Sequence, residues 1–135
     1  WGETIEANPG VMFPLIEARF RSGADVEADA DRLARAALAA LRDRVSARMA
    51  DRLLIMPAVA CMPPETARLL ADEAHYVERN LLALRNTRVA NLLGLSALVV
   101  PVPDRPMTGL MLFAPPREEA RLLAAGAALE RALGG

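Results

Sequence analysis

The sequence predicts an α/β domain in which helices cover a mixed β-sheet. The first observation is the stretch 86–101, NTRVANLLGLSALVVP, which favours a helix up to Gly94 and then becomes β-branched and extended. The second is that segments of helical periodicity alternate with short continuous apolar runs. The third is that 135 residues with 53% apolar side chains are enough to bury a core.

The chain is expected to form a single segment over 1–135, without an internal repeat or linker. Residues 1–23 mix Gly, Pro and Asn with scattered apolar residues and are predicted to be an irregular lead-in with one helical turn at 15–20. Residues 24–135 are predicted to run helix, strand, helix, strand, strand, helix. The chain begins with Trp1 rather than Met, and we expect it to be a piece of a longer protein.

A long amphipathic helix is predicted over 25–49. Leu33, Ala37, Leu41 and Val45 recur every four residues, and most of the arginines lie away from this stripe. Asp25 or Asp29 can cap the beginning of this helix. The stripe is therefore expected to pack on an apolar surface.

The next two elements are a strand and a second helical segment. Leu53–Val59 is a short apolar run that fits a strand buried on both faces. Pro63 and Pro64 force a turn, after which 65–93 has a helical pattern that could break near Asn86.

The C-terminal elements are two strands and a helix. The strands 97–102 and 109–114 are joined by the short loop PDRPMT and are expected to pair antiparallel. Pro115 and Pro116 are predicted to begin the last helix, and Gly134 to end it.

Charge and composition exclude several function classes. Sixteen basic residues, all arginine, against seventeen acidic ones leave a net charge of −1, which indicates neither a nucleic-acid surface nor a polybasic membrane patch. The longest apolar run, Leu92–Pro103, is too short to span a bilayer. A single cysteine and a single histidine argue against a disulfide framework and a metal site, and favour a reduced, cytoplasmic setting. No phosphate- or dinucleotide-binding motif is present, so we expect no cofactor.

No catalytic group is predicted within the chain, although some residues have two interpretations. His75 could act as a base toward Ser22, Ser46 or Ser96, or could cap a helix. Cys61 could lie at the edge of a cleft or be structural. The carboxylates Asp72, Glu73 and Glu78 could serve acid–base chemistry or form a solvated face, and GLSAL lacks the second glycine of a nucleophile turn.

Four segments, in order from Arg19 to Leu133, resemble the carboxyl-terminal part of the amidase signature family of serine amidohydrolases. RFRSG resembles the family's R-x-x-x-G, and DRLLIMPAVACMPP its D-x-L-L-x-P-T-x-P strand. NTRVANLLGLSALVVP is similar to N-x-x-G-x-P-A-x-x-x-P, and GLMLFAPPREEARLLAAGAALE to G-L-Q-L with the closing helix. Ser96 and Met111 replace the family's usual proline and glutamine.

The resemblance implies the C-terminal portion of an amidase signature fold whose parent hydrolyses an amide C–N bond of a small molecule. The family's catalytic lysine and two serines lie upstream of the resembled part, and this chain contains no lysine, so the fragment alone is expected to be inactive. Arg19 matches the arginine that in some members reaches a polar group of the substrate; an ion pair at the end of a helix is the alternative.

A different class of function stays open beside the amidase. The chain could be a stand-alone, non-catalytic binding or scaffold module with an amidase-like surface. In either case, strands cut from a larger sheet leave an exposed edge, so the chain is expected to self-associate through its sheet.

Overall fold

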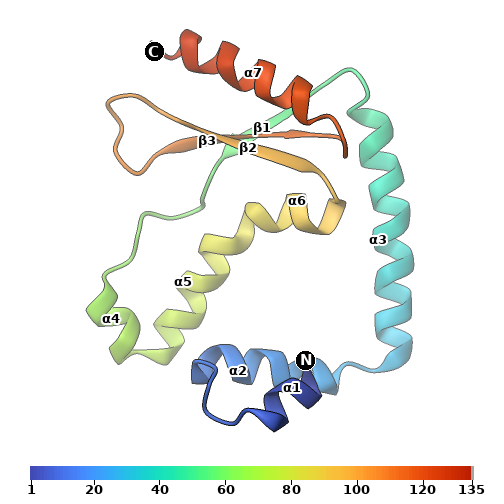
Figure 1. Cartoon of the computed structure of the whole chain (residues 1–135), viewed down its shortest axis with the longest axis vertical. Coiled ribbons are helices and arrows are strands. Elements are labelled where there is room, and N and C mark those ends of the chain that lie inside the picture. Colours follow the sequence, from blue (N-terminus) through green and yellow to red (C-terminus); the bar gives the residue numbers. More distant parts are fainter. Residues whose placement is uncertain (135) are drawn as a thin grey trace. The chain divides into compact units, whose positions relative to one another are not determined.

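A three-stranded sheet with helices against both faces forms the core of the second of two compact units in the chain (Figure 1). The computed structural model describes residues 1–134, and the units divide between Ala37 and Leu38. The predicted α/β class is confirmed. The elements are α1 Gly2–Ala7, α2 Pro14–Arg21, a 3₁₀ turn Ser22–Asp25, α3 Ala28–Arg48, β1 Leu54–Pro57, α4 Thr66–Ala71, α5 Glu73–Arg85, α6 Thr87–Leu93, β2 Ser96–Pro101, β3 Gly109–Ala114 and α7 Glu119–Ala132.

Most of the N-terminal 23 residues lie in two helices, α1 and α2, where an irregular lead-in with a single helical turn was predicted. Pro14 is the first residue of α2, where its missing N–H costs nothing, and the Pro9–Gly10 turn with Gly10 at φ 75° separates α1 from α2. An ion pair between Arg21 of α2 and Glu6 of α1 joins the two helices, and a second ion pair links Arg21 to Glu17 within α2. Proline and glycine therefore mark the boundaries between the helices of this segment and do not prevent the helices from forming.

Helix α3 begins three residues later than predicted and ends one residue earlier, and its apolar stripe is largely uncovered. Leu33 is 60% exposed and Leu41 41% exposed. Only Val45 and the following Met49 enter the core, where they pack with Ala90 of α6. The expected packing of the helix is thus confirmed only at its C-terminal end.

The sheet order is β1-β3-β2, and both pairings are antiparallel. No parallel pair occurs among residues 1–134, so the described sheet is antiparallel rather than mixed. The β2–β3 pairing predicted from the short loop is confirmed, with Leu98 opposite Leu112.

Central strand β3 buries both of its faces. Met111 and Phe113 point to one side, where they pack with Ala90 of α6. Leu112 and Ala114 point to the other side and pack with Leu122 of α7. Helix α7 lies against this face of the sheet (Figure 1). This alternation is the period of two that a strand between two helical layers requires.

Strand β1 is shorter and more exposed than predicted. Leu54 and Ile55 are 39% and 49% exposed, which contradicts burial on both faces. The reason is that β1 is an edge strand, paired in the described sheet only with β3. A continuous apolar run therefore does not by itself indicate that a strand is central in the sheet.

The helical segment 65–93 divides into three helices. The break at Asn86 confirms the prediction, and the Asn86 side chain donates a 2.8 Å hydrogen bond to the Pro57 carbonyl of β1. A further break occurs at Asp72, whose backbone is extended and whose side-chain carboxylate caps α5 by accepting a 2.9 Å hydrogen bond from the His75 N–H. Gly94 ends α6 in the left-handed region, at φ 67°.

Helix α7 begins at Glu119, three residues later than the predicted start at the prolines. Arg117 has φ 68°, so the chain turns once more after Pro116, and the Pro115 carbonyl accepts the Glu118 N–H. The prolines therefore precede the helix and do not occupy its first turn.

Candidate functional site

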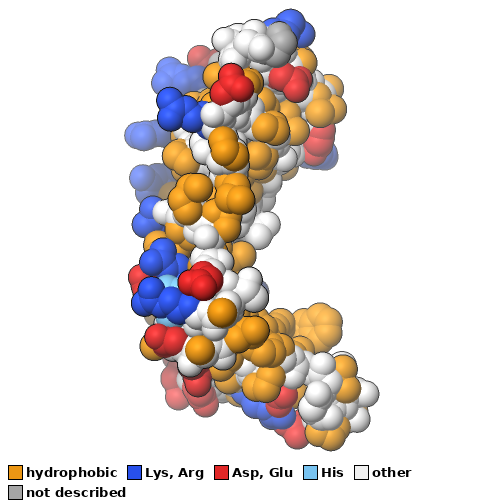
Figure 2. All heavy atoms as spheres, turned by 90° about the vertical axis from the view of Figure 1, so that its left-hand side faces the viewer, with side chains coloured by type: hydrophobic (Ala, Val, Ile, Leu, Met, Phe, Trp, Pro, Cys, Tyr) orange, Lys and Arg blue, Asp and Glu red, His pale blue; other side chains and the backbone are white. Residues whose placement is uncertain are grey.

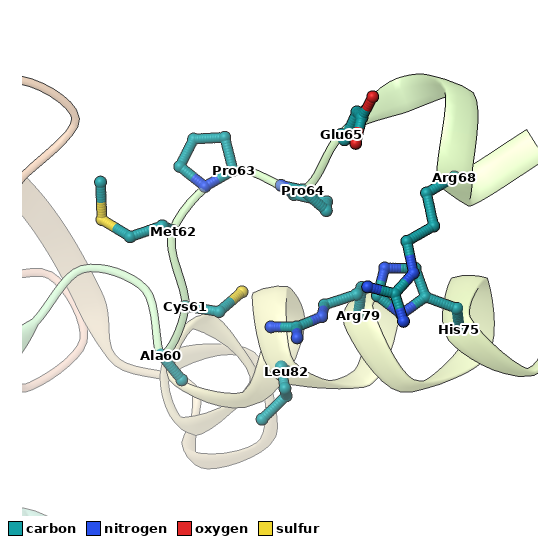
Figure 3. A pocket seen from close by; sticks show the side chains of 10 residues that line it. All are labelled: Ala60, Cys61, Met62, Pro63, Pro64, Glu65, Arg68, His75, Arg79 and Leu82. Atoms are coloured by element: carbon teal, nitrogen blue, oxygen red, sulfur yellow. The ribbon is translucent and has the colours of Figure 1, made fainter.

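The loop after β1 lines a groove made of two adjoining cavities. One has a volume of about 460 Å³ and the other about 280 Å³, and Ala60, Cys61 and Met62 line both. The larger cavity is also lined by Pro63, Pro64, Glu65, Arg68, His75, Arg79 and Leu82 (Figure 3). The smaller is completed by Pro57, Val59, Met107, Thr108 and Gly109.

Helix α5 presents one face to the larger cavity. His75, Arg79 and Leu82 follow one another at i, i+4 and i+7 and line it together. The Asp72 cap fixes the beginning of α5, and His75 in its first turn is only 8% exposed. The opposite wall comes from the two prolines and from Arg68 of α4 (Figure 3).

Two of the residues with open interpretations come together at this groove. Cys61, a half-buried free thiol, and His75 line the same cavity although 14 positions separate them. Cys61 therefore lies at the edge of a cleft, which is the first of the two interpretations of this residue. The backbone N–H of His75 also donates the capping hydrogen bond to Asp72, so His75 takes part in the helix cap through its backbone.

The serines do not join His75. Ser22 donates a 2.9 Å hydrogen bond to the Arg19 carbonyl, and Ser96 donates one of 2.8 Å to Glu119 Oε1. Ser46 lies in α3 and does not line either cavity. The geometry of the described residues thus assembles no serine–histidine pair.

The carboxylates are not an acid–base pair either. Asp72 accepts the cap bond, while Glu73 and Glu78 lie exposed on α5 and line neither cavity. Within residues 1–134 no group of three His, Cys, Asp or Glu side chains could hold a metal ion. No described helix combines the length and apolarity needed to cross a membrane.

The sequence did not predict the two basic residues that line the larger cavity, Arg68 and Arg79. Arg68 and Arg79 come from different helices, and neither forms a salt bridge with any residue that the structure describes. Figure 2 shows blue basic side chains gathered around the pale-blue histidine, with acidic side chains at the margin. The i, i+4 spacing of His75 and Arg79 was the available signal, but nothing in the sequence places Arg68 beside them.

The Nε atom of Arg79 is buried and lacks a hydrogen-bond partner among residues 1–134. Glu65 contributes the carboxylate of the cavity lining, and it forms no salt bridge with Arg68 or Arg79 among the described residues. The cavity therefore presents donors and positive charge to whatever occupies it.

Arg19 lies exposed on α2, in the first unit, and its predicted contact with substrate stays a prediction. Its carbonyl accepts the Ser22 hydroxyl.

Removal of the Ser96 hydroxyl is expected to raise the pKa of Glu119. The Ser96 hydrogen bond is the largest cause of the lowered pKa of this carboxyl, followed by the backbone N–H of Glu119 itself. A ¹³C carboxyl NMR titration of Ser96→Ala should show the pKa shifted upward, and Ser46→Ala should leave it unchanged. An unchanged value in Ser96→Ala would contradict the assignment.

The pH dependence follows from the same bond. Because the folded-state pKa of Glu119 is lowered, its contribution to stability is present above the unfolded-state pKa and is lost as pH falls through the folded-state pKa. The stability difference between wild type and Ser96→Ala should therefore shrink on acidification.

Comparison with known proteins connects the chain to a deaminase. It is 38% identical over 94 residues to the 2-amino-5-chloromuconic acid deaminase of Comamonas testosteroni, a match that covers 66% of this chain and 20% of the deaminase. The chain thus spans about a fifth of the length of this curated relative. No family model matches the sequence, and no solved structure matches it.

Proposed function

We propose that this chain is the C-terminal portion of a hydrolase of the amidase signature type, which cleaves a C–N bond in a small molecule. The observation that carries the proposal is the 38% identity to a deaminase, a protein named for the loss of an amino group. The match covers most of this chain but only 20% of the relative, which is what a piece of a longer enzyme predicts. The resemblance found in the sequence adds the expectation of an amide as substrate.

The catalytic groups are proposed to lie upstream. A serine would attack the amide carbonyl, a second serine and a neutral lysine would take its proton, and backbone N–H groups would stabilise the oxyanion. This chain has no lysine, and its serines 22 and 96 are engaged in local hydrogen bonds. Its role would be to supply sheet strands, covering helices and one wall of the substrate pocket.

Exposed apolar side chains on α5 support a place within a larger fold. Val77, Leu81 and Leu84 lie at i, i+4 and i+7 and are 46%, 45% and 40% exposed. Such a stripe on a helix is ordinarily covered. We propose that the upstream part of the parent packs on it, since four fifths of the relative's length lies outside the match.

The alternative is a stand-alone binding module, and the groove beside Cys61 is the observation that keeps it open. A cavity of about 460 Å³ with two arginines can bind a ligand without catalysing a reaction. Self-association through the free edge of β1, with Leu54 and Ile55 exposed, is proposed under either function. A monodisperse monomer in light scattering would count against it.

Ammonia release separates the two functions. Simple amides, aryl amides and 2-amino-5-chloromuconic acid would be supplied to this chain and to the protein of its complete reading frame. We expect release only from the longer protein, because the lysine and the nucleophilic serine would be absent from the chain. Release by neither protein would favour the binding module, and release by this chain alone would refute upstream catalysis.

A further inference from the structure

We propose that the larger cavity binds the carboxylate of a small organic acid, and that the adjoining smaller cavity receives the apolar body of the same molecule. That this acid is a substrate rests on the proposed function. The binding itself rests on the cavity, whose chemistry is set by Arg68 and Arg79 together with His75 and Cys61.

Arg79 carries a hydrogen-bond donor that is unpaired within residues 1–134, which favours an anion in the cavity. A buried N–H without a partner is uncommon in folded proteins, because its hydration is lost and nothing replaces it. The Arg79 Nε is in this state among the described residues. An oxygen atom of a bound anion would supply the missing acceptor.

The charge of the cavity also favours an anion. Two guanidinium groups from different helices line it (Figure 3), and the Glu65 carboxylate in the lining forms no salt bridge with either of them among the described residues. Two cations held near each other without an anion repel, so that binding of a carboxylate relieves the repulsion and gains charge-assisted hydrogen bonds. The planar donor fork of arginine matches the two oxygens of a carboxylate.

The smaller cavity favours an organic acid over a bare inorganic anion. The smaller cavity shares Cys61 and Met62 with the larger and is otherwise lined mainly by apolar groups, among them Val59 and Met107. A ligand with an acidic head and an apolar body would fill both. The relative is itself named for an acid, which agrees with this chemistry.

Cys61 provides a direct readout, because it lines both cavities and is the single cysteine of the sequence. Its alkylation rate would be measured with iodoacetate, which is an anion, and with iodoacetamide, which is neutral and of similar shape. Both reagents react with the same thiolate, so the ratio of the two rates cancels any change in thiol reactivity between variants.

The iodoacetate-to-iodoacetamide ratio is expected to fall about 3- to 10-fold in Arg79→Gln and in Arg68→Gln, because each change removes one positive charge beside the thiol. Arg85→Gln is the matched control, since Arg85 lies on the same helix and does not line either cavity. Its ratio should equal that of wild type. An equal ratio in all four proteins would overturn the proposal.

A protection experiment tests the whole ligand. Adipate, a six-carbon dicarboxylate, should slow the iodoacetamide reaction of wild type and lose this effect in Arg79→Gln, whereas the neutral adipamide should not protect. Acetate at the same ionic strength should protect less than adipate. Equal protection by adipamide, or none by adipate, would contradict the carboxylate site. Neither readout requires hydrolysis, so a failed ammonia assay leaves this result standing, and the reverse also holds.

Discussion

Phe113→Ala is expected to cost about 3–5 kcal/mol of folding free energy, the largest single loss in the chain. Phe113 is completely buried in the centre of β3 and packs with Met49, Ala90 and Met111. Because β3 is bonded to a strand on each side, the cavity left by the ring cannot collapse without displacing both pairings. Urea denaturation followed by circular dichroism would measure the loss.

Leu123→Ala is the control for this substitution. Leu123 lies on α7 and is 61% exposed, so its truncation should change the unfolding free energy by less than about 0.5 kcal/mol. Similar losses for the two variants would show that the buried sheet does not dominate the stability of the chain.

Gly94→Val is expected to cost about 2 kcal/mol, because Gly94 ends α6 at φ 67°, where a β-branched side chain is strongly disfavoured. A Cβ placed on Gly94 would meet nothing within 4 Å, so the cost arises from the backbone and not from a clash. The loss of folding free energy among the Gly94 variants should therefore follow how strongly each residue disfavours the left-handed backbone conformation. Gly94→Ala should lose about 1 kcal/mol, and Gly94→Asn less, since asparagine tolerates the left-handed region.

The same denaturation experiment would measure the series. Gly23→Ala is its control, because a Cβ at Gly23 also meets nothing within 4 Å and its φ is not positive. This variant should be neutral or slightly stabilised. Equal losses for Val, Ala and Asn at position 94 would contradict the explanation.

Local sequence signals allowed two features of the second half of the chain to be predicted. Gly94 was predicted to end a helix, and it does so because it adopts the left-handed conformation that ordinary residues avoid. The strands beside PDRPMT were predicted to pair, and a short loop leaves them little alternative to the antiparallel register seen. Each of these features depends on residues close in sequence.

Errors arose where a local pattern permitted more than one structure. Pro9 and Gly10 mark a turn between two helices as readily as an irregular segment. The apolar run in β1 fits an edge strand as well as a central one, and Asp72 gives no sign in isolation that its side chain will cap α5. The neighbours that decide these cases are distant in the chain.

The candidate site shows most clearly which features follow from the local sequence and which depend on residues distant in the chain. The amino-acid composition establishes that the chain lacks lysine and has one cysteine and one histidine, which restricts the chemistry that it can supply. The helix end at Gly94 and the pairing of β2 with β3 also follow from the sequence, because short-range backbone preferences govern both. By contrast, Arg68 of α4 and Arg79 of α5 line one cavity with Cys61 only because of the tertiary fold. That meeting depends on how the chain turns at Pro63, Pro64 and Asp72, and the packing of separate elements, rather than the preference of any one residue, sets those turns.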